Sequence, residues 1–307
     1  MSFPRKITSI LNFKKSDLIK LFELAQQGKS LFENNQNLLK NKILGSFFFE
    51  ASTRTRISFS SAFLRLGGSI INTSDIEQTR SGSVYHESLE DLGRLIGGYC
   101  ECVILRTPNV EHMKLVADAV TIPFISAGHG LTTLSTEGFN LPQKDLPENP
   151  TQALTDLFTL YQLFGDLNRL SEILIIGNGR AINSLRLGLS YWPSIKIHVL
   201  SLNDSPSNQE YLTRLTPNRE FHYQSIQELL NYPGLEKIQS LYTVYSKQII
   251  DQSFLSYFSN DIVLLDPMPR LAISREIDTL HNAKYFEQAY NSLYVRGALF
   301  VKLFSGA

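Results

Sequence analysis

The chain is short of the residues that mark disulfide-rich and metal-binding proteins. It contains 2 cysteines and 1 tryptophan in 307 residues, which excludes a framework of several disulfides and a zinc site built from clustered cysteines. Cys100 and Cys102 stand two residues apart at the start of an expected strand. We interpret them as buried free thiols in a reducing compartment, the cytoplasm, and we expect no metal site.

The sequence also lacks an excess charge and long apolar runs. Its 29 basic residues balance 29 acidic ones, so no overall field attracts nucleic acid. No apolar stretch reaches the length that a membrane-spanning helix needs. The first residues, Met1-Ser2-Phe3-Pro4-Arg5-Lys6, lack the apolar segment of a secretory signal. We therefore expect neither a nucleic-acid partner nor a membrane partner.

What the sequence does contain is an alternation of strand and helix patterns. Apolar runs bounded by turn residues alternate with segments whose apolar residues recur at helical spacing. The expected strands are 43–49, 69–72, 102–105, 123–126, 173–176, 195–200, 240–243 and 262–265. The expected helices are 15–34, 54–66, 87–97, 111–119, 150–164, 181–191 and 285–302. This rhythm predicts an α/β fold with parallel sheets covered by helices on both faces.

Length and rhythm together predict two doubly wound parallel-sheet domains. We expect the first domain to span 1–149 and the second to span 150–284, with a last segment, 285–307, that completes the first domain. Residues 128–149 interrupt the rhythm and are rich in Gly, Thr, Ser, Pro and Asn. A loop of this length inside a compact domain is usually functional or mobile.

The most informative segment is Ser52-Thr53-Arg54-Thr55-Arg56, which follows an apolar strand and opens a helical pattern. The first amides of a helix lack partners inside the helix, and the helix dipole favours negative charge there. The hydroxyl groups add donors, and an arginine can grip a phosphate with two hydrogen bonds. The segment therefore predicts an anion site. The alternative is an ordinary capped helix with solvated arginines.

A second turn, Gly177-Asn178-Gly179, follows another expected strand and matches part of a dinucleotide fingerprint. Ile182 occupies the position of the third glycine, so we expect no nicotinamide and no other cofactor. In doubly wound sheets, ligands bind beyond the carboxyl ends of the strands. The segments with unusual composition stand at such positions: 52–56, 106–108, 177–180 and 266–270.

Taken together, these segments resemble the motifs of the aspartate and ornithine carbamoyltransferases. The resemblance rests on segments in family order over most of the chain: Phe48-Phe49-Glu50-Ala51-Ser52-Thr53-Arg54-Thr55-Arg56, Leu66-Gly67-Gly68-Ser69, Glu87-Ser88-Leu89-Glu90-Asp91, Leu105-Arg106-Thr107-Pro108, Asn149-Pro150-Thr151-Gln152 and Asp266-Pro267-Met268-Pro269-Arg270. The Pro-x-Pro-Arg form, with no cysteine beside it, is similar to the aspartate branch.

The resemblance implies a transferase that moves the carbamoyl group of carbamoyl phosphate to an amine, that of L-aspartate in pyrimidine biosynthesis. It implies a homotrimer with shared active sites. The residues it assigns to carbamoyl phosphate are Ser52, Thr53, Arg54, Thr55, Arg106, Gln152 and Met268. Those it assigns to catalysis are Arg54, Thr55, Arg106, Asn149 and Gln152, and those it assigns to the amino acid are Arg180, Ser81 and Met268.

Several positions depart from the family pattern, most of them on the amino-acid side. Asn149 stands where the family has histidine, and it can still donate to a carbonyl oxygen. Tyr85 occupies the position of a lysine, and Val244 that of an arginine. Asp266 replaces a histidine and brings a negative charge toward a dicarboxylic substrate. Candidate cations that could compensate are Arg80, His86, Lys247, Arg270 and Arg275.

Three hypotheses stay open at this point. The chain is an aspartate carbamoyltransferase with compensating cations, or a carbamoyltransferase for a less acidic amine. Alternatively, it is a catalytically impaired relative that serves assembly, with a partner such as another enzyme of the pyrimidine pathway. The carbamoyl-phosphate motifs favour an enzyme, whereas the departures at Tyr85, Val244 and Asp266 leave the acceptor open.

Overall fold

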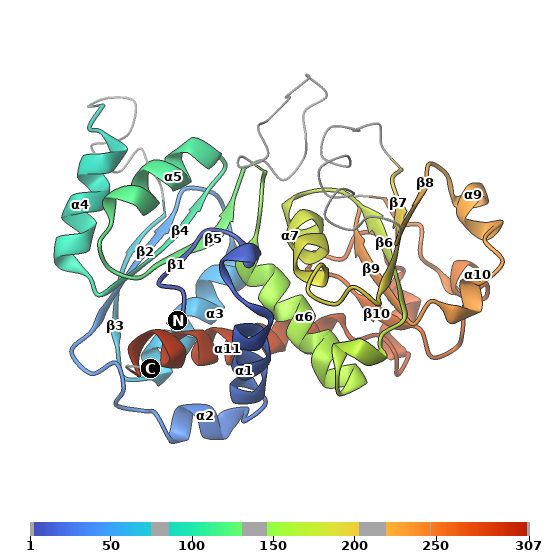
Figure 1. Ribbon diagram of the computed structural model, residues 1–307, viewed down its shortest axis with the longest axis horizontal. Helices are drawn as coiled ribbons and strands as arrows, with labels where there is room; N and C mark the ends of the chain where they lie inside the picture. The colour runs from blue at the N-terminus through green and yellow to red at the C-terminus, as the bar shows by residue number, and fades with distance from the viewer. Residues whose placement is uncertain (1–2, 75–85, 131–145, 203–218, 246, 306–307) are drawn as a thin grey trace.

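The computed structural model describes residues 3–74, 86–130, 146–202, 219–245 and 247–305 (Figure 1). The first sheet contains β1 (Lys6–Ile7), β2 (Ile43–Phe48), β3 (Ser69–Thr73), β4 (Cys102–Thr107) and β5 (Phe124–His129). The helices of this half are α1 (Lys15–Ala25), α2 (Lys29–Glu33), α3 (Thr53–Arg65), α4 (Leu89–Tyr99) and α5 (Val110–Ala119), with the 3-10 helix η1 (Ile10–Asn12).

The second sheet contains β6 (Glu172–Gly177), β7 (Lys196–Leu200), β8 (Glu220–Tyr223), β9 (Ser240–Val244) and β10 (Val263–Leu265). The later helices are α6 (Pro150–Phe164), α7 (Arg180–Leu189), α9 (Ile226–Leu230), α10 (Gln252–Leu255) and the long α11 (Tyr285–Phe304), which packs chiefly against α3, α6 and α1. Short 3-10 helices are η4 (Leu167–Arg169), η5 (Leu235–Lys237) and η6 (Arg275–Thr279). None of the described helices is both long and apolar enough to cross a membrane.

Both sheets are parallel in every described strand pair, which confirms the predicted α/β class. The strand orders are β1-β5-β4-β2-β3 and β10-β9-β6-β7-β8. In each sheet the chain first moves to one side and then crosses to the other, so each sheet has a topological switch point. These points lie between β2 and β4 in the first sheet and between β6 and β9 in the second.

Apolar side chains buried on both faces of the strands explain the sheets. Residues 173–176 of β6 are Ile-Leu-Ile-Ile and are fully buried, as expected of a central parallel strand. One hydrophobic cluster runs from α1 and the inner face of the first sheet through α6 and α11 to β6 and β7. Two smaller clusters fill the outer faces under α4 and α5 and under α9 and α10. Helices α6 and α11 thus lie between the two sheets (Figure 1).

The structure corrects several expected elements. The helix predicted over 15–34 is broken into α1 and α2 at Gly28, whose φ of 60° lies outside the helical region. Strands β1 and β8 were not predicted, because neither contains the run of apolar residues that marks the predicted strands. Residues 128 and 129 belong to β5 rather than to a loop, and 131–145 lie outside the described residues. Both cysteines are free and buried, as predicted.

Candidate active site

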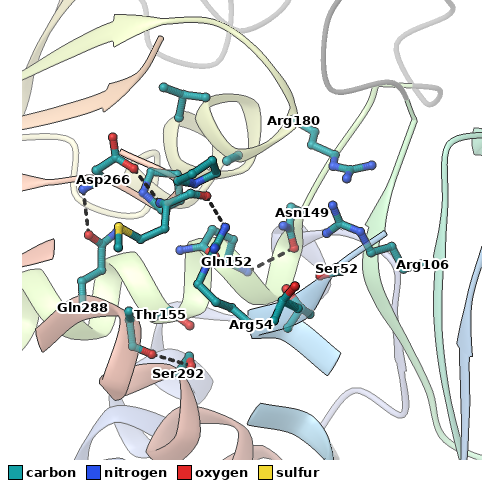
Figure 2. Close-up of a pocket in the computed structure, with 18 of the residues that line it drawn as sticks. Ser52, Arg54, Arg106, Asn149, Gln152, Thr155, Arg180, Asp266, Gln288 and Ser292 are labelled. Atoms are coloured by element: carbon teal, nitrogen blue, oxygen red, sulfur yellow. Dashed lines mark hydrogen bonds between the residues drawn. The ribbon is translucent and has the colours of Figure 1, made fainter. Parts of the chain in front are cut away.

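A cavity of about 470 Å³ opens where the carboxyl ends of β2, β4, β6 and β9 face one another. Figure 2 shows Arg106 and Arg180 on one side, Asp266 and Gln288 on the other, and Arg54 and Gln152 between them. Every predicted site residue in the described part of the chain lines this cavity: Ser52, Thr53, Arg54, Thr55, Arg106, Asn149, Gln152, Arg180 and Met268. The switch points of both sheets therefore open on one shared site.

The turn before α3 is arranged to receive an anion. Ser52 is the N-cap, with an extended backbone at φ −157°, and its side chain makes no capping hydrogen bond. No acidic residue stands in the first turn of this helix. The hydroxyl group and the first amides of α3 are therefore not satisfied by the helix itself. This geometry favours the anion site over the ordinary capped helix.

Arg54 reaches across the cavity to the segment that follows β10. Its Nη2 donates to the carbonyl oxygen of Met268 at 2.6 Å. Met268 has a φ of 62°, in the left-handed region that non-glycine residues rarely adopt. Its backbone amide donates to Asp266 Oδ1 at 2.5 Å, so Asp266 holds this turn in place. Figure 2 shows both hydrogen bonds beside the cavity.

Gln152 is oriented by a buried carboxyl group. Its Nε2 donates to Asp156 Oδ1 at 2.7 Å, and Gln288 Nε2 donates to the same oxygen at 2.6 Å. Asp156 Oδ2 accepts from the hydroxyl of Tyr242 at 2.8 Å. Because its amide nitrogen is held this way, Oε1 is the group of the Gln152 side chain that is left to accept a hydrogen bond. Gln288 Oε1 in turn accepts from the backbone amide of Asp266 at 2.9 Å.

Burial shifts both acidic groups of this network. Burial raises the pKa of Asp156 to about 7, although hydrogen bonds from Gln288, Gln152 and Tyr242 oppose the shift. Burial likewise raises the pKa of Asp266 to about 7 against the Met268 amide and the charge of Arg54. Near neutral pH, the far side of the cavity therefore carries less negative charge than its two carboxyl groups suggest.

Asn149, the replacement for the family histidine, caps α6. Its Oδ1 accepts from the backbone amide of Gln152 at 3.3 Å and from Thr151 Oγ1 at 3.4 Å. Pro150 follows at the first helical position, where a missing N–H costs nothing. With the oxygen engaged in the cap, Nδ2 is the group of Asn149 that is left to donate. A donor at this position suits a carbonyl oxygen.

Two arginines on the other side of the cavity share Glu50. Arg180 Nη1 and Nη2 donate to the two oxygens of Glu50, each at 2.8 Å, and Nη1 also donates to the carbonyl of Gly130. Arg106 Nη2 reaches Glu50 Oε1 at 3.3 Å. Burial alone would raise the pKa of Glu50, but Arg180 and Arg106 bring it below its ordinary value. Glu50 is thus ionised and orients Arg180.

Three polar cavity residues on α11 were not predicted. Gln288, Ser292 and Arg296 all line the cavity. They recur at intervals of four on a helix that is otherwise largely buried and apolar. Polar side chains at i, i+4 and i+8 lie along one face of a helix, so this stripe was a usable signal. It was missed because α11 carries none of the family motifs.

The departures from the family pattern fall into two groups. Val244 and Asp266 line the cavity, as their alignment implied. Ser81, Tyr85 and Arg80 lie outside the described residues. The described walls contain Arg54, Arg106, Arg180 and Arg296, but not the other proposed cations, His86, Lys247, Arg270 and Arg275. Arg270 instead pairs with Asp278 and lies on the rings of Tyr285 and Phe286.

Fold and site together define a two-sheet α/β protein with one arginine-rich cavity between the switch points of its sheets. A sequence model of the "Aspartate/ornithine carbamoyltransferase, carbamoyl-P binding domain" matches residues 5–134. The aspartate carbamoyltransferase catalytic subunit of Sulfurisphaera tokodaii is 31% identical over 97% of this chain and 99% of its own length. The chain belongs to the aspartate/ornithine carbamoyltransferase family.

Solved structures agree on the architecture. The catalytic subunit of aspartate transcarbamoylase from M. jannaschii has a TM-score of 0.77 with 26% sequence identity and covers 98% of both chains. Aspartate transcarbamoylase from Trypanosoma cruzi, in complex with carbamoyl phosphate and aspartate, also has a TM-score of 0.77, with 24% identity over 96% of this chain and 95% of that one. At this identity, the second comparison shows the shared fold alone.

Proposed function

We propose that this protein transfers the carbamoyl group of carbamoyl phosphate to the amine of L-aspartate. The observation that carries the proposal is the convergence of the 52–55 turn, Arg106, Asn149 and Gln152 on one cavity. The amine nitrogen attacks the carbamoyl carbon and forms a C–N bond. The bond from that carbon to the phosphate oxygen then breaks, the oxygen keeps the electron pair, and the departing phosphate takes up the proton that the amine loses. Phosphate leaves.

In the carbamoyl-phosphate half, each group has a task that its geometry suits. The residues that would hold the phosphate are Ser52, Thr53, Arg54, Thr55 and Arg106. Gln152 Oε1 would accept from the carbamoyl amide, because Asp156 holds its Nε2. Asn149 Nδ2 would donate to the carbonyl oxygen as negative charge develops there. Such a preorganised donor is worth roughly 3 kcal/mol of barrier.

Phosphate would compete for Arg54 with the carbonyl oxygen of Met268, which accepts from Arg54 in the structure. A doubly charged phosphate is the stronger acceptor. Its arrival would free the Met268 oxygen to accept from the incoming amine. Met268 would then touch both substrates, and carbamoyl phosphate would need to bind before the amine.

On the acceptor side, Arg180 would bind the α-carboxylate of the amino acid. Glu50 holds the Arg180 guanidinium at the cavity. Ser81 would contribute from a neighbouring subunit. Val244 and Asp266 line the same cavity in place of family cations, and this observation favours a second candidate, a carbamoyltransferase for a less acidic amine. The third candidate is an assembly role without turnover.

A homotrimer is part of the proposal, and an apolar patch on the first sheet's edge supports it. Ile57 and Leu64 on α3 are 60% and 55% exposed, and both line one surface hollow together with Ile70 of the edge strand β3. Exposed apolar side chains grouped on one edge are typical of an interface. A second copy of the chain would cover them. The division into domains at residues 149 and 150, and the cytoplasmic location, also remain predictions.

Transfer of a radiolabelled carbamoyl group tests the three candidates directly. The label would be offered with aspartate, with asparagine and with a panel of uncharged amines. Labelled carbamoyl aspartate supports the leading proposal and excludes a purely structural role. Label on an uncharged amine alone supports the second candidate. No labelled product with any amine, from protein that binds carbamoyl phosphate, would sink both enzymatic candidates.

A further inference from the structure

Arg296 is a buried cation without the partners that a buried cation needs. Arg296 is 2% exposed and is the third residue of the polar stripe on α11. Within the described part of the chain, neither Nε nor Nη1 has a hydrogen-bond partner. Leaving donors of a buried charged group unpaired costs more than leaving neutral ones. A structural role alone therefore does not account for this arginine.

The neighbours of Arg296 do not neutralise it. The guanidinium lies 4.6 Å from the ring centroid of Phe59 on α3, a contact that stabilises a cation only modestly. Asp156 is the acidic group whose charge favours the protonated form, but its oxygens accept from Gln152, Gln288 and Tyr242. Burial, and then the charge of Arg106, lower the pKa of Arg296.

The position of Arg296 connects it with the phosphate turn. Thr55 and Phe59 are four residues apart and so share one face of α3, and both are buried. Because Arg296 lies on the Phe59 ring, it stands beside this face, about one turn from Thr55 and nearly two turns from the start of the helix. Both Arg296 and Thr55 line the cavity. An anion at the helix start would thus lie within the field of Arg296.

We propose that Arg296 is a further anion-binding residue of this cavity, which donates to the phosphoryl group through nitrogens that lack partners when the cavity is empty of anion. The inference rests on the proposed function for the identity of the anion, a phosphate ester or the released phosphate. Arg296 comes from α11 rather than from the motifs around β2 and β4, so it links the last helix of the chain to substrate binding.

The experiment is a calorimetric titration with inorganic phosphate. Arg296→Met keeps much of the side-chain volume and removes the charge, and Arg296→Lys keeps a charge without the fork. We expect Arg296→Met to weaken phosphate binding at least about tenfold and Arg296→Lys to weaken it less. In the transfer assay, the KM for carbamoyl phosphate should rise while the KM for the amine stays the same. Phosphate binding within twofold of the unaltered protein would overturn the inference.

The matched control is Arg65→Met, because Arg65 also lies on a phenylalanine ring, that of Phe32, but is exposed and outside the cavity. It should bind phosphate normally. If Arg296→Met does not fold, the phosphate-induced rise in Tm of Arg296→Lys decides, and a rise equal to that of the unaltered protein would overturn the inference. If Arg54→Ala loses phosphate binding and Arg296→Met keeps it, this inference fails and the proposed function stands. If the unaltered protein binds no phosphate, both fail.

Discussion

Asp156 connects the residues of the two halves of the cavity. It accepts from Gln152 on its own helix and from Gln288 on α11, and Gln288 holds the backbone of Asp266. Asp266 in turn fixes the turn at Met268, whose carbonyl accepts from Arg54. One unbroken series of hydrogen bonds therefore runs from the proposed carbamoyl-amide group to the proposed phosphate group. A substitution at Asp156 should therefore alter the positions of both groups.

Asp156 also predicts a pH dependence of stability. An unfolded aspartate titrates near pH 4, whereas burial raises the pKa of Asp156 to about 7. The stability linked to its protonation is complete below about pH 4 and is lost as the pH rises through about 7. Asp156→Asn should abolish the uptake of one proton on folding. The free energy of unfolding should then fall less steeply with pH, by at most about 1.4 kcal/mol per pH unit.

Denaturant titrations over this range measure the slope. The control is Glu23→Gln, which alters an exposed carboxylate on α1 and should leave the slope unchanged. Equal slopes for Asp156→Asn and the unaltered protein would show that Asp156 does not carry the linkage. Asp266 and Glu148, whose pKa values burial also raises to about 7, would then be the remaining sources.

A second prediction concerns the residues that would bind the acceptor amine. Asp266→Asn keeps the acceptor for the Met268 amide and removes the charge, and Val244→Arg restores a cation to the cavity wall. If the lost cations limit aspartate binding, the double variant should lower the KM for aspartate about tenfold. Steady-state kinetics with aspartate and with a neutral amine measure this. An equal gain for both amines would contradict the electrostatic explanation.

Single residues show how far sequence reasoning reaches. The 52–55 turn was predictable because a local pattern of hydroxyl groups and arginine at a helix start has its own chemistry. Gln288 and Arg296 were missed because α11 carries none of the family motifs. Their polar stripe marks one face of the helix, but it does not specify that this face returns to the cavity. Asn149 was predicted to donate, and its second role as the cap of α6 became visible only with the hydrogen bonds.

At the scale of elements, the turn between β6 and α7 places Arg180. Gly177 ends β6 with a φ of 105° and Gly179 caps α7 with a φ of 112°, both in the region that favours glycine. A Cβ on Gly177 would lie 2.0 Å from the carbonyl oxygen of Val244 on β9. The dinucleotide-like appearance of this turn therefore has a structural cause, the close approach of two strands at the cavity.

Gly177→Ala should consequently cost more than about 2 kcal/mol of stability, because the backbone is strained and the added carbon meets backbone atoms. Gly98→Ala on α4 is the matched control, since a Cβ there meets nothing within 4 Å and alanine favours the helix by about 0.5 to 1 kcal/mol. Thermal unfolding of both variants measures the difference. A stable Gly177→Ala protein would refute the proposed close approach.

The elements that were predicted share one property, a long periodic or apolar signal. The strands 173–176 and 195–200 and the helix 150–164 are of this kind, and the structure places them within a residue or two. The break at Gly28 was missed because the apolar spacing of α1 continues into α2. Strand β8 was missed because this edge strand, Glu220–Tyr223, contains no run of apolar residues.

For the whole molecule, the largest hydrophobic cluster contains α1, α6, α11 and strands of both sheets, so the two halves share this part of their cores. The cavity forms where they meet, so substrate binding and the relative placement of the halves are coupled. The proposed function also involves a trimer, because we expect Ser81 to act in the active site of a neighbouring subunit. A site would then need two chains.

Mixing two inactive variants tests the shared site. Arg54→Ala and Ser81→Ala should each lose activity alone. If neighbours share sites, equal mixing and reassembly should restore about one site in four, because some sites draw both intact residues from different chains. Activity after mixing, with each variant mixed with itself as the control, measures this. No recovery from a trimeric mixture would mean that each chain completes its own site.

Calorimetric titration of carbamoyl phosphate into the unaltered protein and into Arg54→Ala measures whether the 52–55 turn holds this substrate. Arg54 stands at the start of α3 and faces the cavity. Losing a charge-assisted pair of hydrogen bonds predicts binding weaker by about a hundredfold. Unchanged affinity in Arg54→Ala would contradict the proposed role of the turn.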